Sequence, residues 1–189
     1  MNKGLLIVVS SPSGGGKGTI LAQLDKSNMV FSVSATTRSP RDGEIHAKHY
    51  YFLSKREFEE KIKNGQMLEH AVFCDNFYGT PKEPVEKALS QGKDVILEIE
   101  VQGAKKVAKI MPECISIFIT PPSIEVLEQR LRGRGTEDEQ TIQKRLNRAK
   151  EELQMADDYD YVVVNDTVEK AVSDIEQILR NEKSKANKA

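Results

Sequence analysis

Residues 11–19 read Ser-Pro-Ser-Gly-Gly-Gly-Lys-Gly-Thr, and this stretch decides the fold. A short apolar run precedes it at residues 5–9, and the helical pattern Ile-Leu-Ala-Gln-Leu follows it at residues 20–24. Glycines in a loop between a strand and a helix let successive backbone N–H groups point at one anion. The arrangement therefore predicts a P-loop that holds the phosphates of a nucleotide, with Lys17 reaching the outer phosphates.

Two positions of this loop depart from the strict P-loop pattern. Ser11 stands where the first glycine belongs, and Gly18 stands where the metal-binding serine or threonine belongs. A glycine-rich turn with a solvated lysine is therefore an alternative, although the strand–loop–helix context favours nucleotide binding. The predicted phosphate-binding residues are Ser11, Pro12, Ser13, Gly14, Gly15, Gly16, Lys17, Gly18 and Thr19.

Apolar runs like the one before the loop recur at residues 95–99, 115–119 and 161–164. Such continuous runs are typical of strands buried on both faces of a parallel sheet. Helical patterns lie between or after them, and this alternation predicts an α/β fold with a doubly wound parallel sheet. Helix starts are expected at pairs with capping-box spacing and helix ends at glycines: Ser54 with Glu57, Thr80 with Glu83 (and a first-turn Pro81), Thr136 with Glu139, Asp166 with Glu169, and Gly65, Gly92 and Gly133.

Two segments interrupt this alternation. Residues 31–80 are rich in aromatic residues and short extended pieces, which predicts a small, mostly β insertion. Residues 133–148 open with Gly-Arg-Gly and carry three arginines, which predicts a mobile, arginine-rich helical lid over a phosphate site. We therefore expect one domain over residues 1–189, with a core at about 1–30, 81–132 and 156–182, the insertion at about 31–80, the lid at about 133–155 and a disordered tail at 183–189.

The composition argues against several classes of function. Lysine and arginine number 28 against 29 for aspartate and glutamate, whereas a generic nucleic-acid binder shows a basic excess. No apolar stretch approaches the roughly 20 residues that span a bilayer, and the run at residues 5–9 is too short for a signal peptide. Cys74 and Cys114 are interpreted as free thiols of a reducing compartment. We expect a soluble, cytoplasmic protein that binds neither nucleic acid nor membrane.

Residues 31–41, Phe-Ser-Val-Ser-Ala-Thr-Thr-Arg-Ser-Pro-Arg, resemble the nucleotide-acceptor motif of guanylate kinases. The resemblance extends in order over about residues 4–182. It implies an enzyme that transfers phosphate from ATP to GMP or dGMP, with a small GMP-binding insertion in a P-loop core. The further segments that carry the resemblance are residues 43–44, 50–52, 68–69, 78–80, 96–103, 130–135, 144–146 and 164–166.

The acceptor site is predicted from its chemistry and from the resemblance. Arg38 and Arg41, three residues apart, can clamp one phosphate through forked N–H donors, although solvated loop arginines are the common alternative. A carboxylate can accept both adjacent donors of guanine, and hydroxyls can donate to its carbonyl. The resemblance implies that Glu69 is this carboxylate. The GMP-binding residues that it implies are Ser34, Arg38, Arg41, Tyr50, Glu69, Tyr78, Thr80, Glu98 and Glu100, the last standing where the family usually has aspartate.

The resemblance also implies the donor side of the site. Asn165 would contact adenine, Arg130 would stand at the base of the lid, and Arg134 and Arg145 would fold over the transferred phosphate. Arg148 is interpreted as solvated surface, because the predicted helix at about residues 137–155 has its apolar stripe elsewhere, at Ile142, Leu146, Ala149 and Leu153. The expected catalytic residues are Lys17, Arg38, Arg134 and Arg145.

Mg²⁺ is the expected cofactor and arrives with ATP. Because Gly18 has no hydroxyl, ATP oxygens are expected to hold the ion, with Thr19 or Glu98 helping through its water ligands. Two other functions remain open. A non-catalytic guanylate-kinase-like binding module would tend to lose Lys17 or the lid arginines, and a kinase for another nucleoside monophosphate gives no reason for the carboxylate at position 69.

Overall fold

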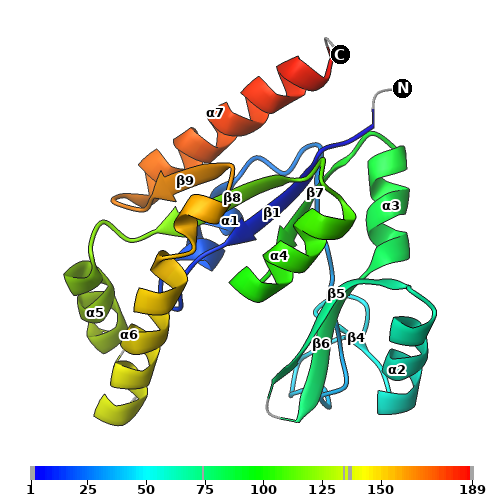
Figure 1. Cartoon of the computed structure of the whole chain (residues 1–189), viewed down its shortest axis with the longest axis horizontal. Coiled ribbons are helices and arrows are strands. Elements are labelled where there is room, and N and C mark those ends of the chain that lie inside the picture. Colours follow the sequence, from blue (N-terminus) through cyan, green and yellow to red (C-terminus); the bar gives the residue numbers. More distant parts are fainter. Residues whose placement is uncertain (1–2, 74, 134, 136–137, 188–189) are drawn as a thin grey trace. The chain divides into compact units, whose positions relative to one another are not determined.

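The computed structural model describes residues 3–73, 75–133, 135 and 138–187 (Figure 1). Its secondary structure alternates strands and helices, which confirms the predicted α/β class. The strands are β1 (Leu6–Ser10), β2 (Met29–Phe31), β3 (Ala35–Thr36), β4 (Tyr51–Phe52), β5 (Met67–Phe73), β6 (Asn76–Pro81), β7 (Asp94–Glu98), β8 (Ile115–Thr120) and β9 (Tyr161–Val164). The helices are α1 (Lys17–Gln23), α2 (Lys55–Lys63), α3 (Lys82–Ser90), α4 (Val101–Ile110), α5 (Ile124–Gly133), α6 (Glu139–Leu153) and α7 (Val168–Ala186), with a 3₁₀ turn at Ala156–Asp158.

A five-stranded sheet of order β2-β7-β1-β8-β9 forms the core. The pairs β2–β7 and β8–β9 are parallel, and every residue of β1 is buried. Continuous burial of this kind reflects a strand covered on both faces, which only apolar runs tolerate. The predicted parallel sheet is thus confirmed, and the glycine-rich loop follows its central strand.

The chain divides into two compact units. The first comprises the residues up to Val8 together with Asn28–Cys114, and the second comprises Val9–Ser27 together with the residues from Ile115 onward. Among the described residues, no helix combines the length and the apolarity that crossing a bilayer requires. Cys114 is buried and is not part of a disulfide, as predicted, whereas Cys74 lies outside the described residues.

The first unit holds a four-stranded sheet of order β4-β3-β6-β5. The pairs β3–β6 and β5–β6 are antiparallel, and β3–β4 is parallel. One face of this sheet packs on α2 around Ala35, Phe58 and Met67. The insertion is thus the predicted mixed/β piece, with α2 as its helix. One boundary needs correction: Phe31 belongs to the five-stranded sheet, because β2 pairs with β7.

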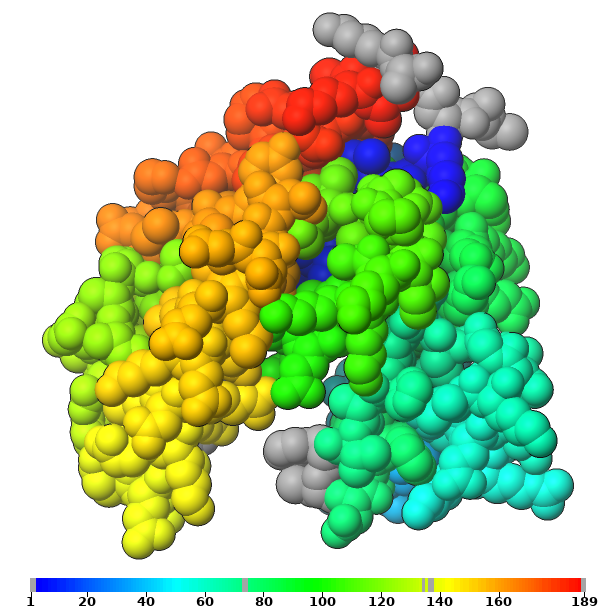
Figure 2. Space-filling view, viewed as in Figure 1, coloured from blue at the N-terminus to red at the C-terminus, as the bar shows by residue number. Residues whose placement is uncertain are grey.

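The second unit contains the helix pair α5 and α6. Their contact is apolar and includes three of the four predicted stripe positions on α6, whereas Leu153 is only half-buried and Glu152 is buried instead. In the space-filling view α6, coloured yellow to orange, presents a long face to solvent (Figure 2). The buried cluster consists of Leu127, Leu131, Ile142, Leu146 and Ala149.

Helix starts agree with the capping predictions in part. Ser54 and Glu57 form the predicted capping box of α2. Thr80 does not cap α3, because its hydroxyl donates to Glu69, and Pro81 takes the N-cap position. Asp166 is wrong by one residue: Thr167 caps α7 and accepts the N–H of Lys170.

For α6 the N-cap is Asp138, and the predicted cap at Thr136 lies outside the described residues.

Helix ends follow the glycine prediction more closely. Gly65 and Gly92 have φ of 65° and 76° and stand just after the C-caps of α2 and α3, where a left-handed residue ends a helix. Gly133 is the last residue of α5. At the C-terminus α7 runs to Ala186, so the disordered tail predicted from Lys183 is wrong for residues 183–186.

Candidate functional site

The glycine-rich loop of the second unit has a backbone that only glycine tolerates at two positions. Gly14 and Gly16 both have φ of 88°. A Cβ at Gly14 would stand 2.8 Å from Leu131 Cδ2, and a Cβ at Gly16 would collide with the Asn165 amide. Neighbouring side chains pack so closely on Gly14 and Gly16 that no Cβ fits at either position, and their φ also favours glycine.

Side chains from distant elements hold the loop in place. Asn165, after β9, is buried and donates from Nδ2 to the carbonyl of Gly15 at 2.7 Å. Glu152, at the end of α6, accepts the N–H of Ser13 at 3.3 Å. Arg130 of α5 donates to the carbonyl of Asn165 at 2.9 Å. The loop is therefore fixed from α6 and from the segment after β9.

Two buried polar atoms beside the loop have no hydrogen-bond partner within the described part of the chain. They are Arg130 Nη1 and Asn165 Oδ1. Buried polar atoms are normally paired, so atoms left open beside a phosphate loop are suited to a ligand. Both belong to residues that the sequence predicted on the ATP side.

The two positions that depart from the P-loop pattern, Ser11 and Gly18, differ in their burial. Ser11 is buried, whereas Gly18 is exposed, and a Cβ at Gly18 would meet no atom within 4 Å. Sterics therefore do not require glycine at position 18. Lys17 is the first residue of α1 and is half-buried, and Thr19 is exposed in the same turn.

In the first unit, strand alternation separates a packing face from a polar face. Tyr51 and Phe77 pack on the α2 side of the four-stranded sheet. Their neighbours Tyr50 and Tyr78 therefore point to the opposite face, since successive strand residues alternate. Glu69 and Thr80 are directly paired across β5 and β6, and Thr80 lies two residues from Tyr78. One face of the sheet thus carries four of the predicted GMP-binding residues.

Arg38 is anchored on this polar face by Glu44. Its Nη1 and Nη2 donate to the two carboxylate oxygens of Glu44, each at 2.9 Å. Glu44 also accepts the N–H of Arg41 at 2.7 Å, and these bonds lower the pKa of its carboxyl to about 2. A forked ion pair fixes the plane of a guanidinium as well as its position. Sequence reasoning missed Glu44 as a site residue, although it lies in a motif that carries the resemblance.

Aromatic rings surround the Arg38 guanidinium. Its Cζ lies 5.6 Å from the ring centroid of Tyr50 and 5.9 Å from that of Phe52, within cation–π range. Tyr50 and Tyr78 meet edge to face at 6.2 Å. Burial, followed by the neighbouring Tyr78, raises the pKa of Tyr50 above its ordinary value, so its hydroxyl remains a proton donor at neutral pH.

Glu69 is a buried carboxylate with a dedicated partner. Only 8% of it is exposed, and it accepts the hydroxyl hydrogen of Thr80 at 2.8 Å. Burial raises its pKa above the ordinary 4.5, opposed by the Thr80 hydrogen bond and by the charge of Lys106. A Cβ at Gly103 of α4 would stand 3.0 Å from Glu69 Oε2, so the glycine leaves space for the carboxylate. Sequence reasoning missed the contacts of Lys106 and Gly103.

The remaining predicted residues are less enclosed. Arg41, Glu98 and Glu100 are exposed, while Ser34 is half-buried before β3. Glu100 is the N-cap residue of α4 and makes no side-chain capping bond. On the donor side Arg145 is half-buried on α6, and Arg134 lies outside the described residues.

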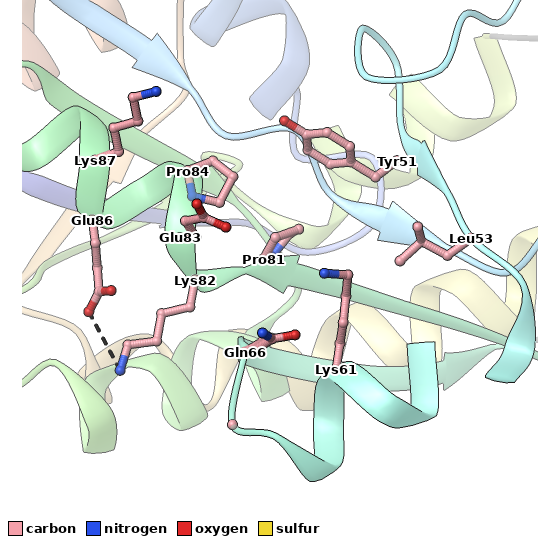
Figure 3. A pocket seen from close by; sticks show the side chains of 11 residues that line it. Tyr51, Leu53, Lys61, Gln66, Pro81, Lys82, Glu83, Pro84, Glu86 and Lys87 are labelled. Atoms are coloured by element: carbon pink, nitrogen blue, oxygen red, sulfur yellow. Dashed lines mark ion pairs between the residues drawn. The ribbon is translucent and has the colours of Figure 1, made fainter. Parts of the chain in front are cut away.

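A cavity of about 540 Å³ opens on the other face of the four-stranded sheet (Figure 3). Tyr51 and Pro81 line it, and they alternate with Tyr50 and Thr80, so it lies on the α2 side. None of the predicted GMP-binding residues lines it, and the Lys82–Glu86 ion pair spans its rim at 3.5 Å. Its full lining is Tyr51, Leu53, Lys61, Gly65, Gln66, Pro81, Lys82, Glu83, Pro84, Glu86 and Lys87.

Comparison with known proteins agrees with this arrangement. A family profile described as guanylate kinase matches residues 3–182. A guanylate kinase of Carboxydothermus hydrogenoformans is 52% identical over 187 residues, which cover 98% of this chain and 92% of that protein. A guanylate kinase of Clostridioides difficile is 50% identical over 190 residues, covering 100% of this chain and 93% of that protein.

A solved structure gives the same result at the level of the fold. The crystal structure of guanylate kinase from Anaplasma phagocytophilum matches with a TM-score of 0.73 and 38% identity, over 96% of this chain and 87% of that one. Since sequence and fold both match over nearly the full length, this chain belongs to the guanylate kinase family.

Proposed function

We propose that this chain transfers the terminal phosphate of ATP to GMP or dGMP, forming ADP and GDP or dGDP. The observation that carries the proposal is the polar face of the four-stranded sheet, where a buried carboxylate and an anchored arginine occur together. Guanine recognition needs the carboxylate, and phosphate recognition needs the arginine. The phosphate loop of the second unit supports binding of the donor nucleotide.

Glu69 is the proposed reader of the base. Guanine presents its ring N–H and its exocyclic amine side by side, and one carboxylate can accept both. The Thr80 hydroxyl and the space left by Gly103 support a fixed carboxylate orientation. Burial strengthens the discrimination, because a base without matching donors would leave a buried carboxylate unpaired.

Arg38 and Arg41 are the proposed clamp for the GMP phosphate, with the hydroxyls of Tyr50 and Tyr78. The cation–π contacts and the Glu44 ion pair preorganise Arg38 on the face that carries both tyrosines. Preorganised donors lower the cost of ordering on binding. The clamp would hold the acceptor oxygen for in-line attack, so the residues after Phe31, up to Thr80, would form the GMP-binding region. Ser34, Glu98 and Glu100 complete the proposed acceptor set.

On the donor side, residues 11–19 are proposed to hold the ATP phosphates. Their backbone N–H groups and Lys17 would offset the phosphate charge. The open atoms of Arg130 and Asn165 are proposed contacts for the rest of the nucleotide.

Transfer itself asks for positioning and charge neutralisation rather than covalent chemistry. We propose that Lys17, Arg38, Arg134 and Arg145 bear on the charge of the moving phosphoryl group. Closure of the lid at about residues 133–155 would bring its arginines to the phosphate and exclude water that hydrolyses ATP. No strong base is needed, because the attacking atom is already a phosphate oxygen.

Mg²⁺ is the proposed cofactor. The Thr19 hydroxyl and the Glu98 carboxylate are both exposed, and oxygen ligands suit this ion. Thr19 or Glu98 would hold its water ligands, while ATP would hold the ion directly. When bound, Mg²⁺ supplies charge neutralisation on the outer phosphates.

The charge balance supports small nucleotides as the partners, rather than nucleic acid. The buried Cys114 is in keeping with the proposed cytoplasmic location.

A panel assay tests the proposed function. ADP release is measured with ATP and, in turn, GMP, dGMP, IMP, AMP, UMP and dTMP. We expect release to depend on GMP or dGMP, at rates at least about tenfold above those with the other bases. A non-catalytic module would release no ADP with any of them, and a preference for AMP, UMP or dTMP would identify a kinase of different base specificity.

A further inference from the structure

Glu152 is a buried acidic residue on a helix whose other buried positions are apolar. It lies in the last turn of α6, beside the cluster formed with α5, and only 6% of it is exposed. Burial of a carboxylate is unfavourable unless hydrogen bonds or an opposite charge compensate. The partners of Glu152 therefore indicate why an acid stands there.

Those partners connect the helix to the phosphate loop. Glu152 Oε2 accepts the N–H of Ser13 at 3.3 Å, and Oε1 accepts from Arg148 Nε at 2.8 Å, one turn earlier on α6. Arg148, which the sequence predicted to be solvated surface, is half exposed and supplies the compensating charge. The carboxylate thus links an element of the proposed lid directly to the backbone of residues 11–19.

Arg145 lies on the same side of α6 as Glu152. Seven residues correspond to about two helical turns and about 10 Å of rise, so positions 145 and 152 are nearly in line along the helix. α6 packs on α5 through an apolar cluster, and a Cβ at Gly14 of the loop would stand 2.8 Å from Leu131 Cδ2 of α5. The phosphate loop therefore contacts both α5 and α6, and the two helices contact each other.

We propose that Glu152 is a positioning residue that sets the placement of Arg145 relative to the phosphate loop. This inference rests on the proposed phosphotransfer, because Arg145 acts there on the phosphoryl group. Loss of the Ser13–Glu152 bond would let the C-terminal end of α6 shift against the loop. An arginine displaced by about 1 Å from a transferring group loses much of its effect on the rate, on the order of a hundredfold.

The effect is expected in turnover and on the ATP side. Ser13, Glu152 and Arg145 all belong to the second unit, whereas the polar face with Glu69 and Arg38 belongs to the first. Glu152→Ala should lower kcat at least about tenfold and raise the KM for ATP, with the KM for GMP within about twofold. Glu152→Gln keeps an acceptor for the Ser13 N–H and should retain more of the wild-type kcat than Glu152→Ala.

The test uses the full chain and a double-mutant cycle. Glu151→Ala, an exposed acid one residue earlier, is the matched control and should behave as wild type. Glu152→Met keeps the buried volume without the acceptor and takes the place of Glu152→Ala if the alanine variant does not fold. If Glu152 acts through Arg145, its replacement should cost little further kcat in an Arg145→Ala background, because coupled residues are not additive.

Two outcomes overturn the inference. One is a kcat for the folded Glu152 variant within about twofold of Glu151→Ala. The other is full additivity of the Glu152 and Arg145 replacements, which would reduce Glu152 to a stabilising role. Wild-type chain that forms no GDP would instead contradict the proposed function, so the two failures are distinguishable.

Discussion

Single residues on the polar sheet face bear most directly on the proposed specificity for GMP. Glu69 and Thr80 form one buried hydrogen bond, and Arg38 and Glu44 form a forked pair. In both pairs, one group that would face the substrate is oriented by a second group of the protein. Substitution of either partner therefore has a directional effect on a defined part of GMP.

Glu69→Gln tests base selection. The glutamine would present one acceptor and one donor to two guanine donors, so GMP activity should fall at least about tenfold. IMP keeps the ring N–H but lacks the exocyclic amine, so the ratio of kcat/KM for GMP to that for IMP should shrink in the variant. An unchanged ratio would show that Glu69 does not read the base.

The pH dependence of GMP use follows from the same carboxyl. Burial raises the pKa of Glu69 above 4.5, so protonation begins at a higher pH than for an exposed glutamate. Because kcat/KM reports groups of the free enzyme, kcat/KM for GMP should fall as the pH is lowered towards this pKa.

The Glu69→Gln variant should lack this fall of kcat/KM for GMP at low pH.

A raised carboxyl pKa also means that ionised Glu69 costs stability, and this cost appears as the pH rises through the folded-state pKa. At pH 7 the variant should therefore melt no lower than wild type.

Glu44→Gln tests the anchoring of Arg38. Without the second carboxylate oxygen the guanidinium loses its fixed plane, and the KM for GMP should rise about tenfold with little change in the KM for ATP. Glu60→Gln breaks an exposed pair with Arg56 and is the matched control, because exposed pairs contribute little. A lower KM for GMP in Glu44→Gln would mean that Glu44 competes with the phosphate instead.

At the scale of elements, the glycine-rich loop and α6 are the parts whose geometry bears on phosphate transfer. Gly14 and Gly16 allow neighbouring side chains to reach the loop backbone, and Glu152 and Asn165 fix that backbone by hydrogen bonds. The loop is thus preorganised before a nucleotide arrives. α6 carries Arg145, and its role is open to a kinetic test.

Arg145→Ala should lower kcat far more than it raises either KM, because the arginine is proposed to act on charge that develops in the transition state. Lys150→Ala removes an exposed positive charge from the same helix and serves as the control. A variant with unchanged kcat and a raised KM for ATP would place Arg145 in ground-state binding. Steady-state kinetics with each substrate varied separately distinguish the two results.

At the scale of the whole molecule, apolar runs were sufficient to predict the parallel core. Residues 5–9, 95–99, 115–119 and 161–164 all lie in or beside strands of the five-stranded sheet. Burial on both faces leaves a strong sequence signal, because it favours a continuous apolar run. The prediction of burial on both faces is wrong for residues 161–164: β9 is an edge strand, and its Val162 and Val164 are 47% and 43% exposed. The resemblance supplied the site residues, and the structure brings Arg38, Tyr50 and Tyr78 together on one face, with Glu69 beside Thr80.

What the sequence did not predict depends on tertiary partners. Thr80 has the spacing of a cap, but Glu69 takes its hydroxyl. An acidic residue such as Glu152 is expected on the solvated face of a helix, but here it is buried and accepts the N–H of Ser13. Glu44 stands six residues from Arg38, a spacing that no regular element explains. Local patterns cannot distinguish these cases, because each is decided by a residue distant in sequence or by loop geometry.

Direct detection of GDP tests the central claim best. Purified chain is incubated with ATP, Mg²⁺ and GMP, and both products are quantified over time beside the Lys17→Met variant. We predict equal amounts of ADP and GDP, no ADP without GMP, and a rate for Lys17→Met lower by orders of magnitude, because the charge that follows the moving phosphate is gone. ADP formation without GDP, or a Lys17→Met variant as fast as wild type, would contradict the account.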